Sequence, residues 1–100
     1  MSEGTAEAAV VADNPERRRF EARLGDEVVG FSAYRRDGDH ITFTHTEVDP
    51  ALEGRGIGST LARSVLDDAR SRGLAVTVEC PFIGAWLRRH EGEYRDLVRG

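Results

Sequence analysis

The chain has 100 residues, 39% of them hydrophobic, and its 14 basic and 18 acidic side chains give a net charge of −4. This length suits one domain with one hydrophobic core. The acidic balance argues against a nucleic-acid-binding protein, which would present a basic surface. The single cysteine excludes an intramolecular disulfide and a cysteine-rich zinc site, and three scattered histidines predict no metal site.

Residues 1–15, MSEGTAEAAVVADNP, are small and polar, and we expect a disordered tail here, ahead of a domain over residues 16–100. The one apolar patch, Ala8 to Ala12, is too short for a signal-peptide core and follows no positive charge. No run approaches the roughly 18 apolar residues of a membrane span. The sequence therefore predicts a cytoplasmic protein without membrane contact.

Three strands are predicted next. RRFEARL ends at a Gly-Asp turn signal, EVVGFSAYRR ends at an Asp-Gly hairpin dipeptide, and HITFTHTEV alternates most regularly. In this third strand Ile41, Phe43 and His45 are expected on one face, with the threonines on the other. The short connections predict an antiparallel meander.

A helix, a strand and a second helix follow. Apolar residues recur at helical spacing from Ile57 to Ala69, and Gly73 favours a helix end. LAVTVE, residues 74–79, is typical of a buried strand, and PFIGAWLRRH of a short helix. The connection length makes residues 42–48 and 75–79 parallel neighbours with a right-handed crossover. The predicted fold class is α/β, with one mixed sheet in the order β-β-β-α-β-α and helices packed on it.

The stretch LEGRGIGSTLA places Gly54, Gly56 and Gly58 at every second position, directly before the first helix. Backbone amides at a helix N-terminus, together with the positive end of the helix dipole, bind anions. Without side chains, the backbone here would admit a phosphate. The alternative is a glycine-rich connection whose glycines only permit a tight turn.

Two other phosphate-binding motifs compete for these glycines. A nucleoside-triphosphate loop requires a lysine, and this loop has none. A dinucleotide fingerprint fits Gly54 and Gly56, and Glu79 stands about 20 residues on, where a ribose-binding acid belongs. Its third glycine would fall at Ser59, however, and a single following strand is too little for that fold.

The segment EVDPALEGRGIGSTLARSVLDDARSRGL resembles the acetyl-coenzyme A motif of the GNAT acetyltransferases, Arg/Gln-x-x-Gly-x-Gly/Ala. The resemblance implies that backbone amides of this loop hold the coenzyme pyrophosphate and that the preceding strand lies along the pantetheine arm. The residues implied to bind acetyl-coenzyme A are Thr46, Val48, Gly54, Arg55, Gly56, Ile57, Gly58 and Ser59. Glu53 stands where arginine or glutamine is usual, and its charge should disfavour a diphosphate unless Arg55 compensates.

From about Arg19 to Val98 the chain more closely resembles the compact single-domain branch of that family, proteins of around one hundred residues. The segments HTEV and VECPFIGAWLRRHEGEYRDLV carry this likeness. The branch has a cysteine at the place of Cys80, as its proposed active residue, and a histidine at the place of His45. One departure is Gly92, where the branch tends to have a proline.

Cys80 is also a candidate nucleophile on physical grounds. The next residue, Pro81, favours the first position of a helix, so the thiol is expected at a helix cap, where the dipole stabilises a thiolate. The alternative is an inert buried cysteine. His45 is a candidate proton acceptor or a core residue, and Glu79 and Glu47 are rival bases.

Two functions follow as hypotheses. The first is transfer of an acetyl group from acetyl-coenzyme A to an amine, through an acetylated Cys80 or directly; Tyr94 either protonates the leaving thiolate or packs on the sheet. The second is a non-catalytic coenzyme A-binding or protein-interaction module, because no additional N-terminal helices are predicted to shape an acceptor pocket. Whether the acceptor is a small amine, a protein or a peptide does not follow from the sequence, nor does the oligomeric state.

Overall fold

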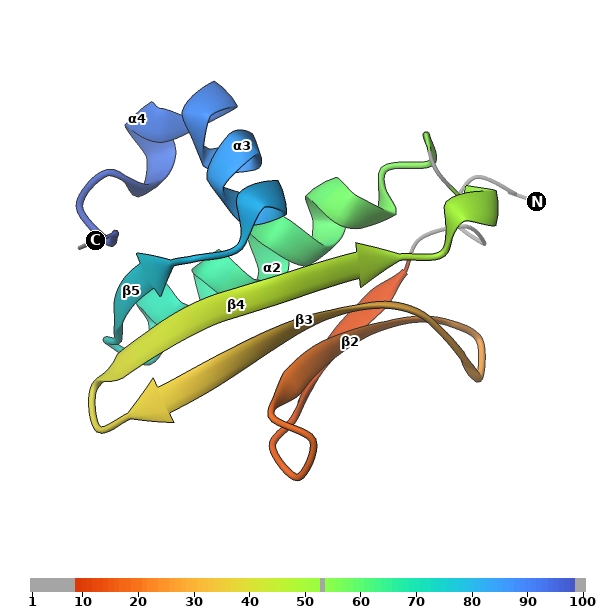
Figure 1. Cartoon of the computed structure of the whole chain (residues 1–100), viewed down its shortest axis with the longest axis horizontal. Helices are drawn as coiled ribbons and strands as arrows, with labels where there is room; N and C mark the ends of the chain where they lie inside the picture. Colours follow the sequence, from red (N-terminus) through yellow and green to blue (C-terminus); the bar gives the residue numbers. More distant parts are fainter. Residues whose placement is uncertain (1–8, 53, 99–100) are drawn as a thin grey trace.

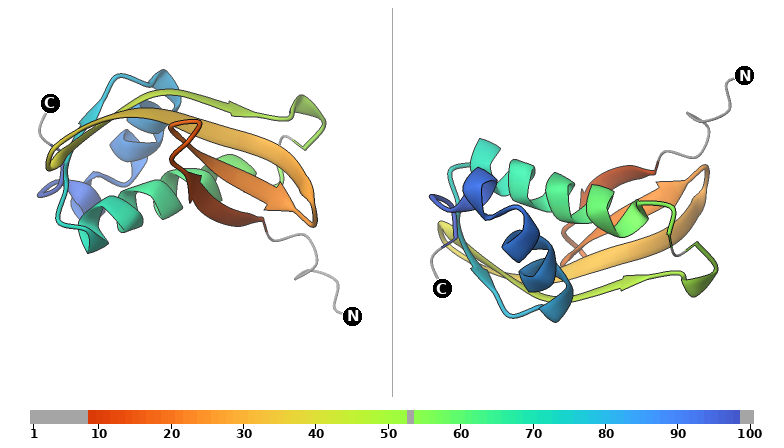
Figure 2. Two further views of the ribbon diagram at one scale, coloured as in Figure 1. Left: turned by 90° about the horizontal axis from the view of Figure 1, so that it is seen from below. Right: turned by 90° about the horizontal axis from the view of Figure 1, so that it is seen from above.

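The computed structural model describes residues 9–52 and 54–98, which form one five-stranded sheet with its helices on one face (Figures 1 and 2). Strands β1 to β4 are antiparallel neighbours in chain order, and β5 pairs with β4 in parallel. The predicted mixed sheet is confirmed. In chain order the elements are β1 (Val10–Asn14), β2 (Arg19–Leu24), β3 (Glu27–Asp37), β4 (His40–Val48), η1 (Pro50–Leu52), α2 (Ile57–Ser71), β5 (Ala75–Val78), α3 (Pro81–Arg89) and α4 (Glu91–Tyr94).

Strand β1 corrects the expected disordered tail. Val10 pairs with Arg23 and Asn14 with Arg19, so β1 is an edge strand of the sheet. Val11 packs partly buried against the core. Pairing with a formed neighbour outweighs the weak strand propensity of alanine, aspartate and asparagine. Residues 1–8 of the expected tail lie outside the described part of the chain.

The core lies between the sheet and α2. Six residues at helical spacing give α2 a fully apolar stripe, as predicted. Burying each large side chain of this kind contributes roughly 1.5–3 kcal/mol. The stripe is Ile57, Leu61, Ala62, Val65, Leu66 and Ala69, and it packs in one cluster with Phe20, Ala22, Tyr34, Ile41, Phe43, Val76, Ile83 and Trp86.

A bulge in β4 changes the pairing with β3. Ala33 pairs with His45, but the next residue, Tyr34, pairs with Phe43. Thr44 is therefore an additional residue on β4, and an additional residue reverses the alternation of side chains beyond it.

The bulge determines which side chains of β4 face the helices. Before it, Ile41 and Phe43 are buried in the core. Beyond it, Thr46 continues on the helix-covered face, whereas His45 and Glu47 are exposed on the opposite, open face. The expectation that His45 shares the face of Ile41 and Phe43 is therefore wrong.

Two tyrosines connect peripheral elements to the core. The Tyr34 hydroxyl donates to Asp13 on β1 at 2.6 Å, and the Tyr94 hydroxyl donates to Asp67 on α2 at 2.6 Å. Both tyrosines are buried. Burial, and then the carboxylate that each contacts, raise the pKa of each phenol to about 12.

These pKa values predict alkaline unfolding. Because the folded pKa lies above the unfolded value of about 10, the stabilisation is complete below that pH and is lost as pH rises towards 12. Tyrosinate absorbance followed alongside circular dichroism measures both events. Tyr34→Phe and Tyr94→Phe each leave a single tyrosine, so the titrations can be assigned. Ionisation of either phenol near pH 10 in the folded protein would contradict the prediction.

Candidate functional site

The glycine corner, Gly54 to Ser59, joins η1 to α2. Gly54 has φ +86° and Gly56 has φ +81°, a left-handed conformation that strains residues with a Cβ atom. Gly56 caps α2 without a side-chain hydrogen bond, and the first turn contains no acidic residue. The first amides of α2 and the positive dipole end therefore lie where an anion can approach them.

Gly58 serves a different purpose. A Cβ atom on Gly58 would overlap the ring of Phe82, which lies in the first turn of α3 and is 40% exposed. A Cβ at Gly54 or Gly56 would meet nothing within 4 Å. The open backbone expected at all three glycines is thus found at two, and Gly58 permits close packing of α3 against α2.

The edge of β4 becomes available where β5 ends. Their ladder stops at Phe43 and Val78. The amides of Glu79 and Cys80 both donate to the Phe43 carbonyl, at 2.9 and 3.1 Å, as the chain turns into α3. Strand β4 continues to Val48, and among the strands that the structure describes only β3 lies beside it there (Figure 1). An extended ligand can add to such an edge through backbone hydrogen bonds.

A hollow of 300 Å³ connects the glycine corner with this edge of β4. All the residues predicted to bind the coenzyme line it except Arg55, which is exposed on the same loop. Glu53, predicted to disfavour the diphosphate, lies outside the described residues. The lining is Thr46, Val48, Leu52, Gly54, Gly56, Ile57, Gly58, Ser59 and Phe82.

Cys80 caps α3 ahead of Pro81, as predicted, and is 2% exposed. Its thiol donates to the Thr46 hydroxyl at 3.2 Å, and that hydroxyl lies 3.0 Å from the hydroxyl of the fully buried Ser32. These three groups link β3, β4 and the start of α3 beside the hollow. Sequence reasoning missed Ser32 and the Thr46–Cys80 contact, because neither follows from spacing along the chain.

His45 forms a pair with Glu47 instead of with Cys80. His45 Nε2 and a Glu47 carboxylate oxygen are 2.7 Å apart, and the rings of His45 and Phe31 pack with centroids 6.0 Å apart. Both polar side chains are more than half exposed on the open face. The bulge at Thr44 thus separates His45 from Cys80, which faces the helices.

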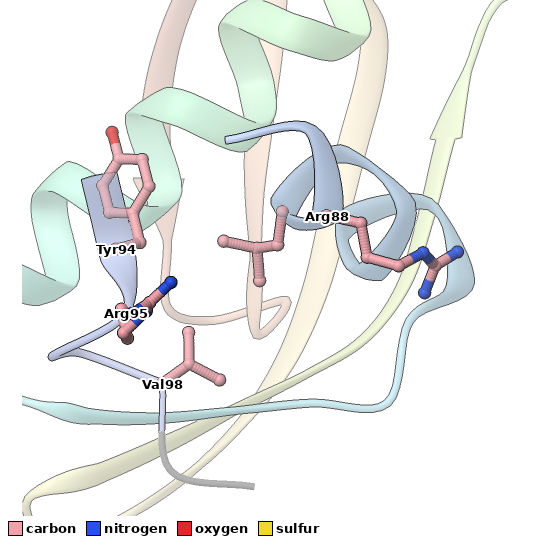
Figure 3. Close-up of a pocket in the computed structure, with 5 residues that line it drawn as sticks. Arg88, Tyr94, Arg95 and Val98 are labelled. Carbon is pink, nitrogen blue, oxygen red and sulfur yellow. The ribbon is translucent and has the colours of Figure 1, made fainter. Parts of the chain in front are cut away.

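The two remaining candidate residues, Glu79 and Tyr94, make contacts outside the hollow at the glycine corner. The Glu79 carboxylate pairs with the Arg35 guanidinium at 3.2 Å, and both side chains are more than half exposed. Tyr94 packs on Trp86 and lines a separate hollow of 270 Å³ with Arg88, Arg95 and others (Figure 3), not the hollow at the glycine corner. Its contacts favour the packing role over protonation of a leaving group.

The residues that the structure describes contain no group of histidine, cysteine and acidic side chains suited to a metal ion. In the same part of the chain no helix is both long and apolar enough to cross a membrane.

Comparisons with known proteins point to one family. Residues 19–97 match the family model of the GCN5-related N-acetyl-transferases. The N-alpha-acetyltransferase RimI of Mycobacterium tuberculosis is 43% identical over 61 residues, which cover 57% of this chain and 39% of RimI. The chain therefore spans well under half the length of that relative.

Two solved structures share the fold. The solution structure of a GCN5-like protein from Staphylococcus aureus superimposes with a TM-score of 0.70 at 25% identity, covering 94% of this chain and 91% of that one. Rv2747 of Mycobacterium tuberculosis, crystallised in complex with CoA, gives a TM-score of 0.58 at 27% identity, covering 87% and 59%.

The packing of Phe82 on Gly58 yields a stability prediction. Gly58→Ala should have a free energy of unfolding about 1–3 kcal/mol lower than Gly84→Ala, because both gain helix propensity but only the Cβ at position 58 overlaps a ring; adding Phe82→Ala to Gly58→Ala should relieve most of that loss. Gly84→Ala in α3 is the matched control, since its Cβ would lie 3.9 Å from Val78 and helix propensity favours alanine. Denaturant unfolding of the unchanged chain and of the three variants measures these differences. Equal stability of Gly58→Ala and Gly84→Ala would contradict the packing argument.

Proposed function

Because the chain belongs to the GCN5-related N-acetyltransferase family, we propose that it transfers an acetyl group from acetyl-coenzyme A to an amine. The observation that carries the proposal is that one hollow connects the N-terminus of α2, where an anion can bind, with the open edge of β4 beyond Phe43. Acetyl-coenzyme A combines a diphosphate with an extended amide-containing arm, so it needs both features together. The thioester supplies the activated acetyl group.

The glycine corner fits the diphosphate by shape and by charge. The Cβ directions of Gly54 and Gly56 are empty, which leaves the backbone accessible, and the N-terminal amides of α2 supply donors. The Arg55 side chain adds positive charge on the same loop. Residues Thr46 to Val48 would pair with the pantetheine amides along the edge of β4.

The acceptor amine is proposed to approach from the open face of the sheet. On the helix-covered face, Phe82 and α2 enclose the hollow. Beyond Phe43 no strand of the described residues shields the outer edge of β4, so a group held there is accessible from the opposite face. His45 lies on that face, and a carboxylate partner such as Glu47 holds an imidazole in one tautomer and orientation for accepting a proton.

Cys80 is proposed to orient the site and not to carry the acetyl group. Its thiol is buried and donates to a hydroxyl, not to an imidazole or carboxylate that could remove its proton. Thr46, which lines the hollow, accepts that bond. The thiol therefore holds the side chain of Thr46 in the wall of the hollow.

Binding is tested by titrating amide signals with coenzyme A and, separately, with pantetheine, which lacks the diphosphate. Coenzyme A should shift the signals of residues 46–48 and 54–59 and bind at least about tenfold more tightly, since its phosphates gain charge-assisted hydrogen bonds. Equal affinities, or unmoved glycine-corner signals, would refute the assignment of the diphosphate. If coenzyme A binds but no amine tested raises the release of coenzyme A thiol from acetyl-coenzyme A above the rate of hydrolysis, the non-catalytic module is favoured.

Catalysis is tested by thiol release from acetyl-coenzyme A with a panel of amines. His45→Gln should lower kcat by about 100-fold or more, the usual contribution of a general base. Glu79→Gln is the matched control and should leave kcat close to that of the unchanged protein, because its carboxylate pairs with Arg35. A loss in Glu79→Gln as large as in His45→Gln, or an unchanged kcat in His45→Gln, would contradict the assignment of His45 as the base.

Intact-protein mass spectrometry tests the role of Cys80. Every basic side chain among the 14 is arginine, so no lysine competes for the acetyl group. After incubation with acetyl-coenzyme A, an acetyl adduct that disappears in Cys80→Ala, together with loss of turnover, would establish the covalent route and overturn direct transfer.

A further inference from the structure

Another hollow lies at the opposite end of α2 from the glycine corner. Its volume is 460 Å³, larger than the hollow at the corner. With 15 residues between its ends, α2 separates the two by roughly 22 Å at 1.5 Å per residue. Arginines from the β1–β2 turn, from β3 and from the C-cap of α2 surround it. We call it the arginine hollow; it is lined by Asp13, Pro15, Arg18, Tyr34, Arg35, Arg36 and Arg72.

The arginine hollow concentrates positive charge in an acidic protein. Four guanidinium groups and one carboxylate line it, although the whole chain carries −4. The carboxylate, Asp13, accepts from the Tyr34 hydroxyl at 2.6 Å. Two of the guanidiniums pair with carboxylates outside the lining, Arg35 with Glu79 at 3.2 Å and Arg72 with Asp68 at 3.0 Å. Arg36 donates to the carbonyl of Gly38. Among the described residues, no carboxylate forms an ion pair with Arg18 or Arg36 within 4.0 Å.

Arg18 is held in a strained conformation. Its φ is +55°, and among the described residues no other non-glycine residue has a positive φ. The following two hairpin turns place glycine in this conformation, Gly25 at +61° and Gly38 at +60°. The Arg18 carbonyl accepts from Tyr34 N at 3.0 Å, which fixes the turn against β3. Glycine adopts this conformation without steric strain. An arginine at this position therefore suggests that its side chain has a function that offsets the strain.

We propose that the arginine hollow binds a phosphoryl group. Guanidinium groups form strong paired hydrogen bonds with phosphate oxygens. A phosphoryl dianion can accept from several guanidiniums that converge from different elements, whereas a carboxylate is matched by one. Arg18 and Arg36 supply the principal charge, and Arg72, whose Nε pairs with Asp68 at 3.0 Å, adds its terminal nitrogens as donors. The proposal stands on this end of α2 alone and does not depend on the acetyl transfer proposed above.

The test is an NMR titration of the full chain with inorganic phosphate, replacing chloride at constant ionic strength. Saturable shifts are expected for Arg18, Arg36 and Arg72. Arg18→Asn should weaken phosphate binding by about tenfold or more, the loss of one charge-assisted contact. Arg17→Asn is the matched control, because it removes the same charge from the same turn outside the lining and should keep the affinity.

Thermal unfolding in chloride separates binding from folding. Asparagine tolerates the left-handed conformation, so Arg18→Asn should unfold at the same or a higher temperature than the unchanged chain. A folded variant that loses phosphate supports the proposal. Equal losses in Arg17→Asn and Arg18→Asn, or shifts confined to residues 54–59, would overturn it, and the second result would leave the glycine corner as the anion site.

A phosphoserine peptide and its unphosphorylated counterpart identify the source of the phosphoryl group. Tighter binding of the phosphopeptide than of inorganic phosphate would assign a protein-borne group, and equal binding would assign a free phosphate. Equal binding of the two peptides would show that the phosphoryl group is not recognised and would overturn the proposal.

Discussion

The Phe43 carbonyl is the point at which the parallel pairing of the sheet ends and the edge of β4 opens. It accepts two consecutive amides, from Glu79 and Cys80, and this ends the parallel ladder while β4 continues. Had β5 continued in register, the backbone groups of β4 would be paired and no ligand could add to them. The termination also fixes where α3 begins, and therefore where Phe82 meets Gly58.

The bulge one residue later assigns the side chains of β4 to different tasks. Thr46 faces the hollow and joins Ser32 and Cys80 in a buried polar chain, while His45 and Glu47 face solvent. Buried polar groups of this kind are stable only when each has a partner. Among the described residues, no buried side-chain polar atom lacks one. The same strand thus contributes a fixed donor–acceptor chain to one face and an exposed pair to the other.

The sequence predicted the larger elements because their signals are local. The apolar stripe of α2, the glycines before it and Pro81 after Cys80 each determine structure within a few residues. The bulge has no such signal: TFTHT alternates without a break, and only the pairing with β3 shows that Thr44 is additional. Strand β1 was missed for a related reason, since its small residues become a strand only beside β2. The packing of Phe82 on Gly58 joins residues 24 positions apart and could not be inferred from spacing.

The exclusive use of arginine has a physical basis in this chain. Guanidinium groups lie over aromatic rings at three places, with Arg19 4.6 Å from the Phe31 centroid, Arg63 5.2 Å from that of Trp86 and Arg70 5.1 Å from that of Tyr94. A planar cation stacks on such rings and still donates at its edge, as Arg63 does to Glu93 at 2.7 Å; a lysine ammonium cannot do both as well. Guanidinium also stays protonated and is a poor nucleophile. A chain without lysine therefore keeps its cation–π contacts and has no side-chain amine that an activated acyl group could modify.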